Sequence, residues 1–379
     1  MKRRKRVIIL LCIAFIIVAT GLYVADKWDL SKQPNMQDGS GNSSPITQGN
    51  DKTEGNKHTQ NDEQREEDIL IDLQHIKPDE TGGIMIVMFH NFVETFIPKP
   101  YDKGEFTTTL EEFRQLLQVL YDKKYRLISM KDYLDNNINV AAGCTPMIFT
   151  FDDGTSGQFN LVERDGELVV NSNTAVGIME EFYKSHPDFG LSGVFYVNLG
   201  NSTFEGKGSV EQRLKYLVER GFEIGNHTYS HNDLSAAKSE EDIQKYIGRN
   251  QQAMQNYITR YTMETFSLPF GGYSARYKYK IMQGEYEDVK YENRAILLVG
   301  ANPAHPTTVN GFDSFNVPRV RSNGIQPVNY DLQWWLDYFD KNPGPKYISD
   351  GRINVITVPD RNKNNIVQDR LAGKKLVVY

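Results

Sequence analysis

Residues 146–154 read PMIFTFDDG, a short apolar run that ends in two adjacent carboxylates, Asp152 and Asp153, and a glycine. A run of this length and composition is typical of a strand that is buried on both faces of a sheet. Two like charges side by side repel each other, so the pair adds no stability by itself. The pair is therefore either a solvated turn or a set of groups placed for chemistry.

Short apolar runs alternate with helical patterns on both sides of this stretch. The predicted strands are residues 83–89, 146–151, 192–198, 222–227, 265–270, 295–300 and 353–358, and the predicted helices are residues 109–125, 173–186, 209–221 and 239–258. Apolar strands that alternate with helices indicate a parallel sheet covered by helices. The number of such units favours an α/β fold of the distorted (β/α) barrel type over an open sheet. In barrels of this kind, catalytic groups lie at the carboxyl ends of the strands.

The N-terminal part of the chain does not share this pattern. Residues 2–6 are all basic, and residues 7–25 are nineteen residues without a charge. A membrane-spanning helix needs about 20 apolar residues, whereas the apolar part of a signal peptide has about 7–15. This favours a single uncleaved transmembrane helix over two alternatives, a cleaved signal peptide ending before Asp26 and a helix of a soluble core.

The segment after the predicted anchor is polar and holds few large apolar side chains, so it cannot bury enough surface to fold. We therefore predict a cytoplasmic basic segment (1–6), a transmembrane anchor (7–25), a flexible linker (26–70) and a catalytic domain (71–379). Basic residues flanking a span stay in the cytoplasm, which predicts a single-pass protein of the cell membrane with an extracellular catalytic domain.

Charge and cysteine content exclude two classes of function. The net charge of −6 argues against a nucleic-acid partner, which would require basic clusters. Of the two cysteines, Cys12 lies in the predicted anchor, so Cys144 is alone in the outer domain. A disulfide within this domain and a zinc site built on cysteines are therefore excluded.

Three predicted strands end in groups that bind metals or transfer protons. His90 follows the strand at 83–89, the two aspartates follow the strand at 146–151, and HTYSH follows the strand at 222–227. The spacing of four between His227 and His231 places both imidazoles on one side of a helical turn, so both can reach one ion. Either aspartate can complete the set. Neighbouring side chains of an extended stretch point in opposite directions, so the other aspartate would face the reacting water.

TFDDG followed by HTYSH resembles the motifs of the polysaccharide deacetylases, carbohydrate esterase family 4. The resemblance implies that Asp152 is the catalytic base and that Asp153, His227 and His231 hold a metal ion, usually Zn²⁺ although other divalent transition metals can serve. SLPFGGYS at 267–274 resembles the third motif of the family. It implies that the oxyanion and the substrate are bound here, by the backbone N–H of Phe270 and by Tyr273.

This sequence also departs from the family pattern. Ser267 stands where the third motif usually has an arginine that orients the base, and the fourth and fifth motifs have no clear match. IVMFHN resembles the poly-N-acetylglucosamine deacetylase branch, in which the first strand carries the catalytic acid; here that residue is His90. Within NVPRVRSN, Arg319 or, as the second choice, Arg321 would replace the missing guanidinium.

The resemblance implies metal-dependent N-deacetylation of a cell-envelope polysaccharide, of the peptidoglycan or poly-N-acetylglucosamine type, with release of acetate. Two alternatives stay open: a non-catalytic polysaccharide-binding protein of the same fold, and an O-acetyl esterase acting on polysaccharide. VERDGELVV at 162–170 has the Asp-Gly turn of a hairpin, which is either a wall of the sugar groove or an insertion without a role.

Overall fold

The computed structural model describes residues 72–100, 103–322 and 328–379. The predicted basic segment, transmembrane anchor and linker lie outside these residues. Within the described part of the chain, no helix is both long and apolar enough to cross a membrane.

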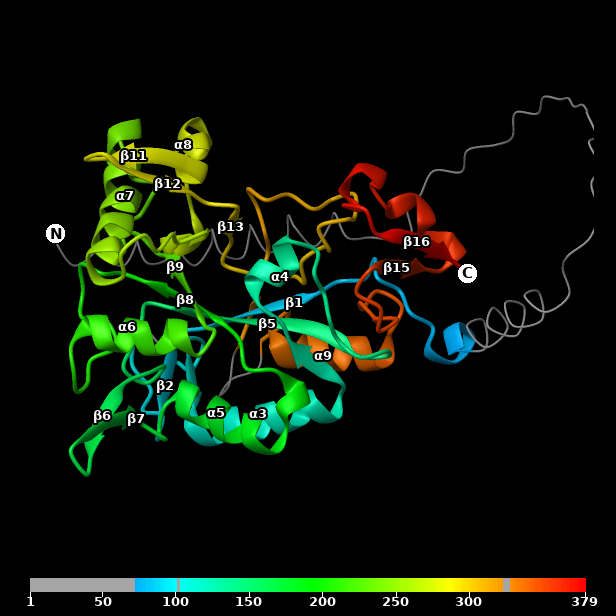
Figure 1. Cartoon of the computed structure of the whole chain (residues 1–379), viewed down its shortest axis with the longest axis horizontal. Helices are drawn as coiled ribbons and strands as arrows, with labels where there is room; N and C mark the ends of the chain where they lie inside the picture. The colour runs from blue at the N-terminus through cyan, green and yellow to red at the C-terminus, as the bar shows by residue number, and fades with distance from the viewer. Residues whose placement is uncertain (1–71, 101–102, 323–327) are drawn as a thin grey trace, which may run out of the picture. The chain divides into compact units, whose positions relative to one another are not determined.

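An eight-stranded sheet, parallel throughout, forms the centre of the domain (Figure 1). Its order is β13-β10-β9-β8-β5-β1-β14, and β4 pairs with the first half of β5. The strands are β1 (Met85–Phe89), β4 (Tyr125–Leu127), β5 (Thr145–Asp152), β8 (Val194–Val197), β9 (Glu223–Asn226), β10 (Thr265–Ser267), β13 (Ala295–Leu297) and β14 (Val320–Arg321). The predicted parallel α/β fold is therefore confirmed.

The two ends of this strand order meet through the residues before β14. The Leu298 N–H donates to the carbonyl of Val317 at 2.9 Å, and the Val317 N–H donates to Ile296 at 2.9 Å. Three residues later, Val320 pairs with Val87 of β1. The sheet therefore curls until its two edges share one segment, which places the carboxyl ends of all the strands around one opening.

Helices connect most of the strands. They are α3 (Leu110–Asp122), α4 (Met130–Leu134), α5 (Ala175–Ser185), α6 (Val210–Glu219), α7 (Glu240–Tyr257), α8 (Lys278–Met282) and α9 (Leu332–Lys341). Side-chain caps fix where the longest ones begin. Thr109 forms a reciprocal capping box with Glu112 at the start of α3, and Ser239 accepts from the Asp242 N–H at the start of α7.

Alternate residues of β1 pack into two different cores. Met85, Val87 and Phe89 belong to the core between the sheet and its helices, whereas Ile84 and Ile86 belong to a second core on the opposite face. All five are buried, and each large apolar side chain removed from water contributes about 1.5–3 kcal/mol. Burial on both faces explains why the strand is apolar throughout.

Four two-stranded pairs surround the main sheet. They are β2 (Asn91–Val93) with β3 (Thr107–Thr109), β6 (Leu161–Arg164) with β7 (Glu167–Val170), β11 (Gln283–Tyr286) with β12 (Val289–Glu292), and β15 (Val355–Val358) with β16 (Lys375–Val378). The antiparallel β6–β7 pair confirms the predicted hairpin. Figure 1 shows β2 and β6–β7 towards the end where β1 finishes, and β15–β16 towards the end where β1 begins.

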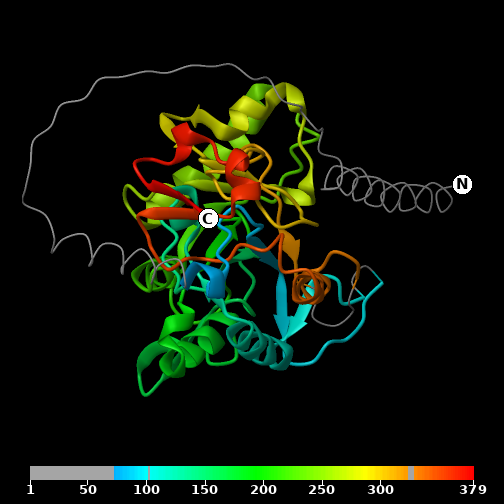
Figure 2. The same ribbon diagram turned by 90° about the vertical axis from the view of Figure 1, so that its right-hand side faces the viewer.

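One expectation about the strands was wrong, and two strands of the main sheet, β4 and β14, were not predicted. The predicted helix 109–125 ends earlier, at Asp122, and Tyr125 begins β4 instead. The predicted strand at 353–358 exists as β15, but it pairs only with β16 and not with the main sheet; this pair faces the viewer in Figure 2. The last strand of the sheet is instead β14, which has two residues. It was not predicted, because two residues flanked by polar side chains give no periodic signal.

Candidate active site

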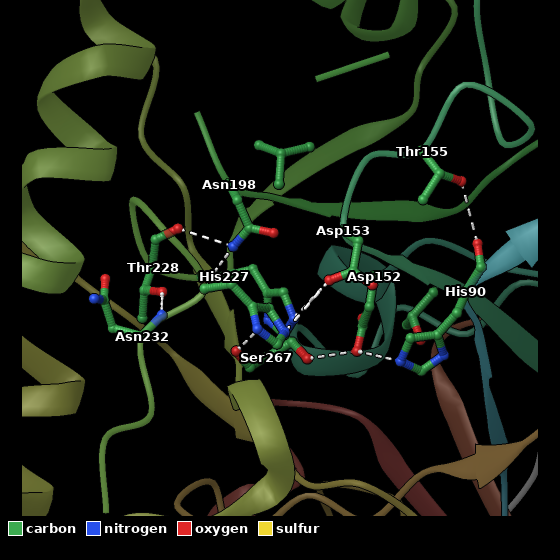
Figure 3. A network of polar contacts seen from close by, with 12 residues as sticks. His90, Asp152, Asp153, Thr155, Asn198, His227, Thr228, Asn232 and Ser267 are labelled. Carbon is green, nitrogen blue, oxygen red and sulfur yellow. Dashed lines mark hydrogen bonds and ion pairs between the residues drawn. The ribbon is translucent and has the colours of Figure 1, made fainter. Parts of the chain in front are cut away.

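The predicted catalytic and metal-binding side chains converge at the carboxyl ends of the strands (Figure 3). His90 follows β1, Asp152 is the last residue of β5, and His227 follows β9. These strands are separated along the chain but share one sheet. The convergence follows from parallel pairing, which brings all the carboxyl ends to the same edge.

Asp153, His227 and His231 form a group that can hold a metal ion, since their ligand atoms all lie within 4.8 Å of one another. The Nε2 atoms of His227 and His231 lie 3.5 Å and 3.4 Å from Oδ1 of Asp153. Ligands about 2.0–2.2 Å from a tetrahedral zinc ion lie about 3.3–3.6 Å from one another. The two distances to Asp153 therefore fit such an ion. Three protein ligands also leave a position for water, as in catalytic sites.

A hydrogen bond at Nδ1, the ring nitrogen that does not face Asp153, fixes the orientation of the His227 ring. Its Nδ1 lies 2.7 Å from the carbonyl of Ser267, which requires a proton on Nδ1 and leaves the lone pair of Nε2 directed towards Asp153. Asn198 donates to the carbonyls of His227 and Thr228 and holds the backbone on the other side. Burial works to lower the pKa of His227, but the carboxylates of Asp152 and Asp153 raise it overall.

The two histidines are not carried on a helical turn, and in this the prediction from their spacing was wrong. The segment after β9 is a turn in which Thr228 and His231 have φ values of 59° and 54°. The Asn232 N–H donates to Oγ1 of Thr228 at 2.6 Å and closes the turn. Asp153 also has a positive φ of 81°. The strained backbone positions therefore gather where the ligand atoms meet, as is common at functional sites.

Arg319 supplies the guanidinium that the third motif lacks. It is fully buried and donates from Nη1 and Nη2 to the two carboxylate oxygens of Asp152, both at 2.8 Å. Its other three donors reach Leu298, Thr150 and Ser267 at 2.8–3.1 Å. All five N–H groups are satisfied, so the side chain is fixed in position.

This pair decides the charge of Asp152. Burial works to raise its pKa, but the charges of Arg319 and His227 together with the Arg319 hydrogen bonds hold the pKa well below its ordinary value. The carboxylate is therefore ionised at neutral pH and presents an acceptor beside the possible metal ion.

Ser267 is a site residue that the sequence marked only as a departure from the family pattern. Its hydroxyl donates to Oδ2 of Asp152 at 3.1 Å and accepts from Nη2 of Arg319 at 2.9 Å. The serine therefore bridges the carboxylate and the guanidinium, and its carbonyl orients His227. The sequence marked this residue by its position, because it stands where the third motif of the family usually has an arginine.

His90 lies across the site from the metal-binding group, with Nε2 3.9 Å from Oδ2 of Asp152. The side-chain amide of Gln158 donates to the carbonyls of His90 and Asp152 and ties the ends of β1 and β5 together. Burial lowers the pKa of His90, although the charges of Asp152 and Asp153 oppose this. The imidazole is therefore neutral at rest and can exchange protons with its surroundings.

Phe270 and Tyr273 occupy different positions. Phe270 has a φ of 58°, is 69% exposed, and its ring lies edge-on to His231 at 4.5 Å. The hydroxyl of Tyr273 donates to the side chain of Asn316 at 3.0 Å. The structure therefore brings Phe270 to the metal-binding group, while Tyr273 is held by a contact of its own. The oxyanion and substrate roles of both stay predictions.

A curled parallel sheet with two carboxylates and three histidines at the carboxyl ends of its strands has the features of a hydrolase. Residues 139–289 match the model of the family described as polysaccharide deacetylase. The domain built by these residues belongs to that family and is a hydrolase that acts on amide bonds. The matched segment includes both aspartates, but His90 and Arg319 lie outside it. No curated protein matches the chain in sequence.

Two solved structures are similar to this chain at low identity. A polysaccharide deacetylase from Bacillus cereus shares 15% identity at a TM-score of 0.49, covering 68% of this chain and 69% of that chain. A Streptococcus pyogenes deacetylase in complex with acetate shares 17% identity at a TM-score of 0.48, covering 68% of this chain and 98% of that chain. Because these likenesses are remote, the family assignment depends on the matched family model.

Proposed function

We propose that this protein is a metal-dependent N-deacetylase of a cell-envelope polysaccharide, of the peptidoglycan or poly-N-acetylglucosamine type. The observation that carries the proposal is the pairing of an ionised Asp152 with the group of Asp153, His227 and His231 at one opening. The extracellular location and the membrane anchor predicted from residues 1–70 are part of this proposal, since they would place the domain near such a polymer.

The positions of the side chains support the roles that we propose for them. Asp152 accepts a proton from the water that attacks the acetamide carbonyl, while Arg319 and Ser267 hold its carboxylate in place. His90, which is neutral at rest and lies 3.9 Å from Asp152, takes up this proton and passes it to the departing nitrogen, so that the C–N bond breaks to give acetate and a free amino sugar. The backbone N–H of Phe270 is the proposed donor to the oxyanion.

Asp153, His227 and His231 would hold the ion, for which Zn²⁺ is our first choice because its ligand geometry matches their spacing. When bound, such an ion polarises the carbonyl and lowers the pKa of a bound water. The chain itself contributes the fixed orientation of the ligands, through the contact of Nδ1 of His227 with the carbonyl of Ser267.

Acetate release tests this proposal directly. The full-length protein is treated with a chelator and dialysed, and it is then incubated with chitooligosaccharides and with peptidoglycan fragments, with and without added Zn²⁺. We expect release of acetate that depends on the metal. A protein that binds these glycans without releasing acetate under any metal condition would be the non-catalytic sugar-binding protein instead.

An O-acetyl esterase can be distinguished from an N-deacetylase by how strongly the reaction depends on His90 as a proton donor. An alkoxide needs less protonation to leave than an amine does, so His90→Ala should be tolerated with an acetylated xylan and not with an N-acetylated glycan. Equal tolerance with both substrates would remove the role of His90 as the acid.

A further inference from the structure

Arg321 lies at the opening of the site, at the carboxyl end of β14 and two residues after Arg319. Successive side chains of an extended strand point to opposite faces. Arg319 points inward and reaches Asp152, and Val320 belongs to the core between the sheet and its helices. Arg321 therefore returns to the inward face, at the carboxyl end of β14. Its backbone pairs with Met88, two residues before His90.

The surroundings of Arg321 confirm this placement. Its guanidinium carbon lies 5.6 Å from the centre of the Phe106 ring, and that ring lies 5.2 Å from His90, edge to face. One aromatic ring therefore separates this cation from the proposed catalytic acid. The side chain is half-buried, so part of it faces the opening.

Within residues 72–100, 103–322 and 328–379, Arg321 forms no ion pair with a carboxylate, unlike Arg319. Among the described residues, its Nε is shielded from solvent and has no hydrogen-bond acceptor. The carboxylate whose charge acts on it, Asp331, is occupied as the cap of α9: its two oxygens accept from the backbone N–H groups of Trp334 and Val328 at 2.9 Å and 2.8 Å. The half-buried guanidinium of Arg321 therefore has no paired anion in the described part of the chain.

We propose that Arg321 determines specificity by binding a carboxylate carried by the polysaccharide substrate, an inference that rests on the proposed deacetylase function. A guanidinium with a donor that lacks an acceptor gains most from a ligand that brings two oxygens in a plane, and a carboxylate does this in a bidentate manner. A neutral N-acetylglucosamine polymer offers only hydroxyl and amide oxygens. The structure therefore favours a glycan with acidic sugars, such as one that contains N-acetylmuramic acid.

A pair of substrates that differ only in charge tests this inference. We would compare an oligosaccharide of alternating N-acetylglucosamine and N-acetylmuramic acid with its methyl ester, measuring both acetate release and calorimetric binding to the full-length protein. We expect wild type to prefer the free acid. Arg321→Gln should reduce the acid-to-ester ratio of kcat/KM by about 10- to 100-fold, mainly through KM, since hydrogen bonds to charged groups are worth this much.

Two further variants complete the design. Arg321→Lys retains the charge without the planar fork, so its ratio should lie between those of wild type and Arg321→Gln. Arg220 at the opposite end of the strands also lies over an aromatic ring, 5.3 Å from Tyr216, so Arg220→Gln should leave the ratio unchanged.

The possible failures are distinguishable. Equal binding of acid and ester by wild type, or an equal ratio in wild type and Arg321→Gln, would overturn the inference. If no glycan is deacetylated but the acid binds more tightly than the ester in an Arg321-dependent manner, the role of Arg321 stands and the proposed deacetylation fails.

Discussion

Asp152 and Glu80 are buried carboxylates at opposite ends of the same parallel strands. Asp152 closes β5 at the carboxyl ends, where Arg319 binds both of its oxygens. Glu80 precedes β1 at the amino ends, where its oxygens accept from the backbone N–H groups of Thr357 and Asp350 at 2.9 Å and 3.3 Å. The two are equally hidden from water, with exposures of 1% and 3%.

Their pKa values move in opposite directions. Burial and, to a smaller extent, the nearby charge of Asp350 raise the pKa of Glu80 to about 7. Burial also acts to raise the pKa of Asp152, but Arg319 reverses the result. The comparison shows that burial alone raises the pKa of a carboxylate. At the carboxyl ends of the strands, the buried cation Arg319 lowers the pKa and keeps Asp152 charged. Each prediction below changes one side of this comparison.

Removing the cation should have the largest effect. Arg319→Gln leaves Asp152 buried without a counter-charge, and breaking a buried ion pair in this way costs about 3–5 kcal/mol. We expect that loss in the free energy of unfolding measured with urea at pH 7. Acetate release should also fall by at least about 100-fold, because the proposed base loses its orientation and its charge.

Arg319→Lys is the matched control for this variant. It retains the charge but cannot bind Asp152, Thr150, Ser267 and Leu298 together, so we expect an intermediate loss of stability. If Arg319→Gln unfolded at the urea concentration of wild type and kept its turnover, the interpretation of this pair would be wrong.

Removing the carboxylate separates the two aspartates by role. Asp152→Asn should reduce acetate release by about 10²- to 10⁴-fold, the usual contribution of a general base, while the amount of metal bound per chain stays near that of wild type. His227→Ala should lose both, since the imidazole is a proposed ligand. Metal content is measured by elemental analysis after gel filtration. Loss of metal from Asp152→Asn would show that the roles of the two aspartates are not divided in this way.

The sequence predicted which residues form the site better than it predicted the hydrogen bonds that hold them in place. Parallel strands must end at one edge, so His90, Asp152 and His227 could be brought together from the strand pattern alone. The bonds of Arg319 could not be predicted in the same way, because β14 has two residues and lies far along the chain from β5. Arg319 was proposed because the third motif lacks its usual arginine. Its five hydrogen bonds could be known only from the structure.

Other features were missed for definite physical reasons. The turn from His227 to His231 depends on positive φ values at Thr228 and His231. A β-branched residue such as Thr228 rarely adopts that conformation, so the sequence did not predict the turn. The strand at 353–358 is as apolar as those of the main sheet. Composition alone cannot show that it pairs with β16 instead.

Glu80 gives a prediction for the opposite end of the strands. Its pKa is about 7 in the folded protein against an ordinary 4.5, so between these pH values the unfolded chain has lost a proton that the folded protein keeps. Stability should therefore fall as the pH rises from about 4.5 to 7, by up to about 3 kcal/mol from this residue. Urea unfolding across this range checks the slope.

Glu80→Gln should flatten that slope, although its overall stability will be lower because an amide offers only one acceptor oxygen. Glu211→Gln, at a half-exposed position on α6, serves as the control and should leave the slope unchanged. An unchanged slope in Glu80→Gln would mean that Glu80 is ionised in the folded protein at low pH, as Asp152 is.

Glu223 gives the smallest expected effect and refines the comparison. Burial raises its pKa to about 7 as well, and its carboxylate accepts from the Met130 N–H at 2.7 Å. However, Glu223 is half-buried and lines a pocket of about 380 Å³ at the amino ends of β9 and β10. Water that enters this pocket can hydrate the ionised form, so Glu223→Gln should remove less of the pH slope than Glu80→Gln, about 1 kcal/mol between pH 4.5 and 7. Equal contributions from the two glutamates would show that access to water through the pocket does not moderate the penalty of burial.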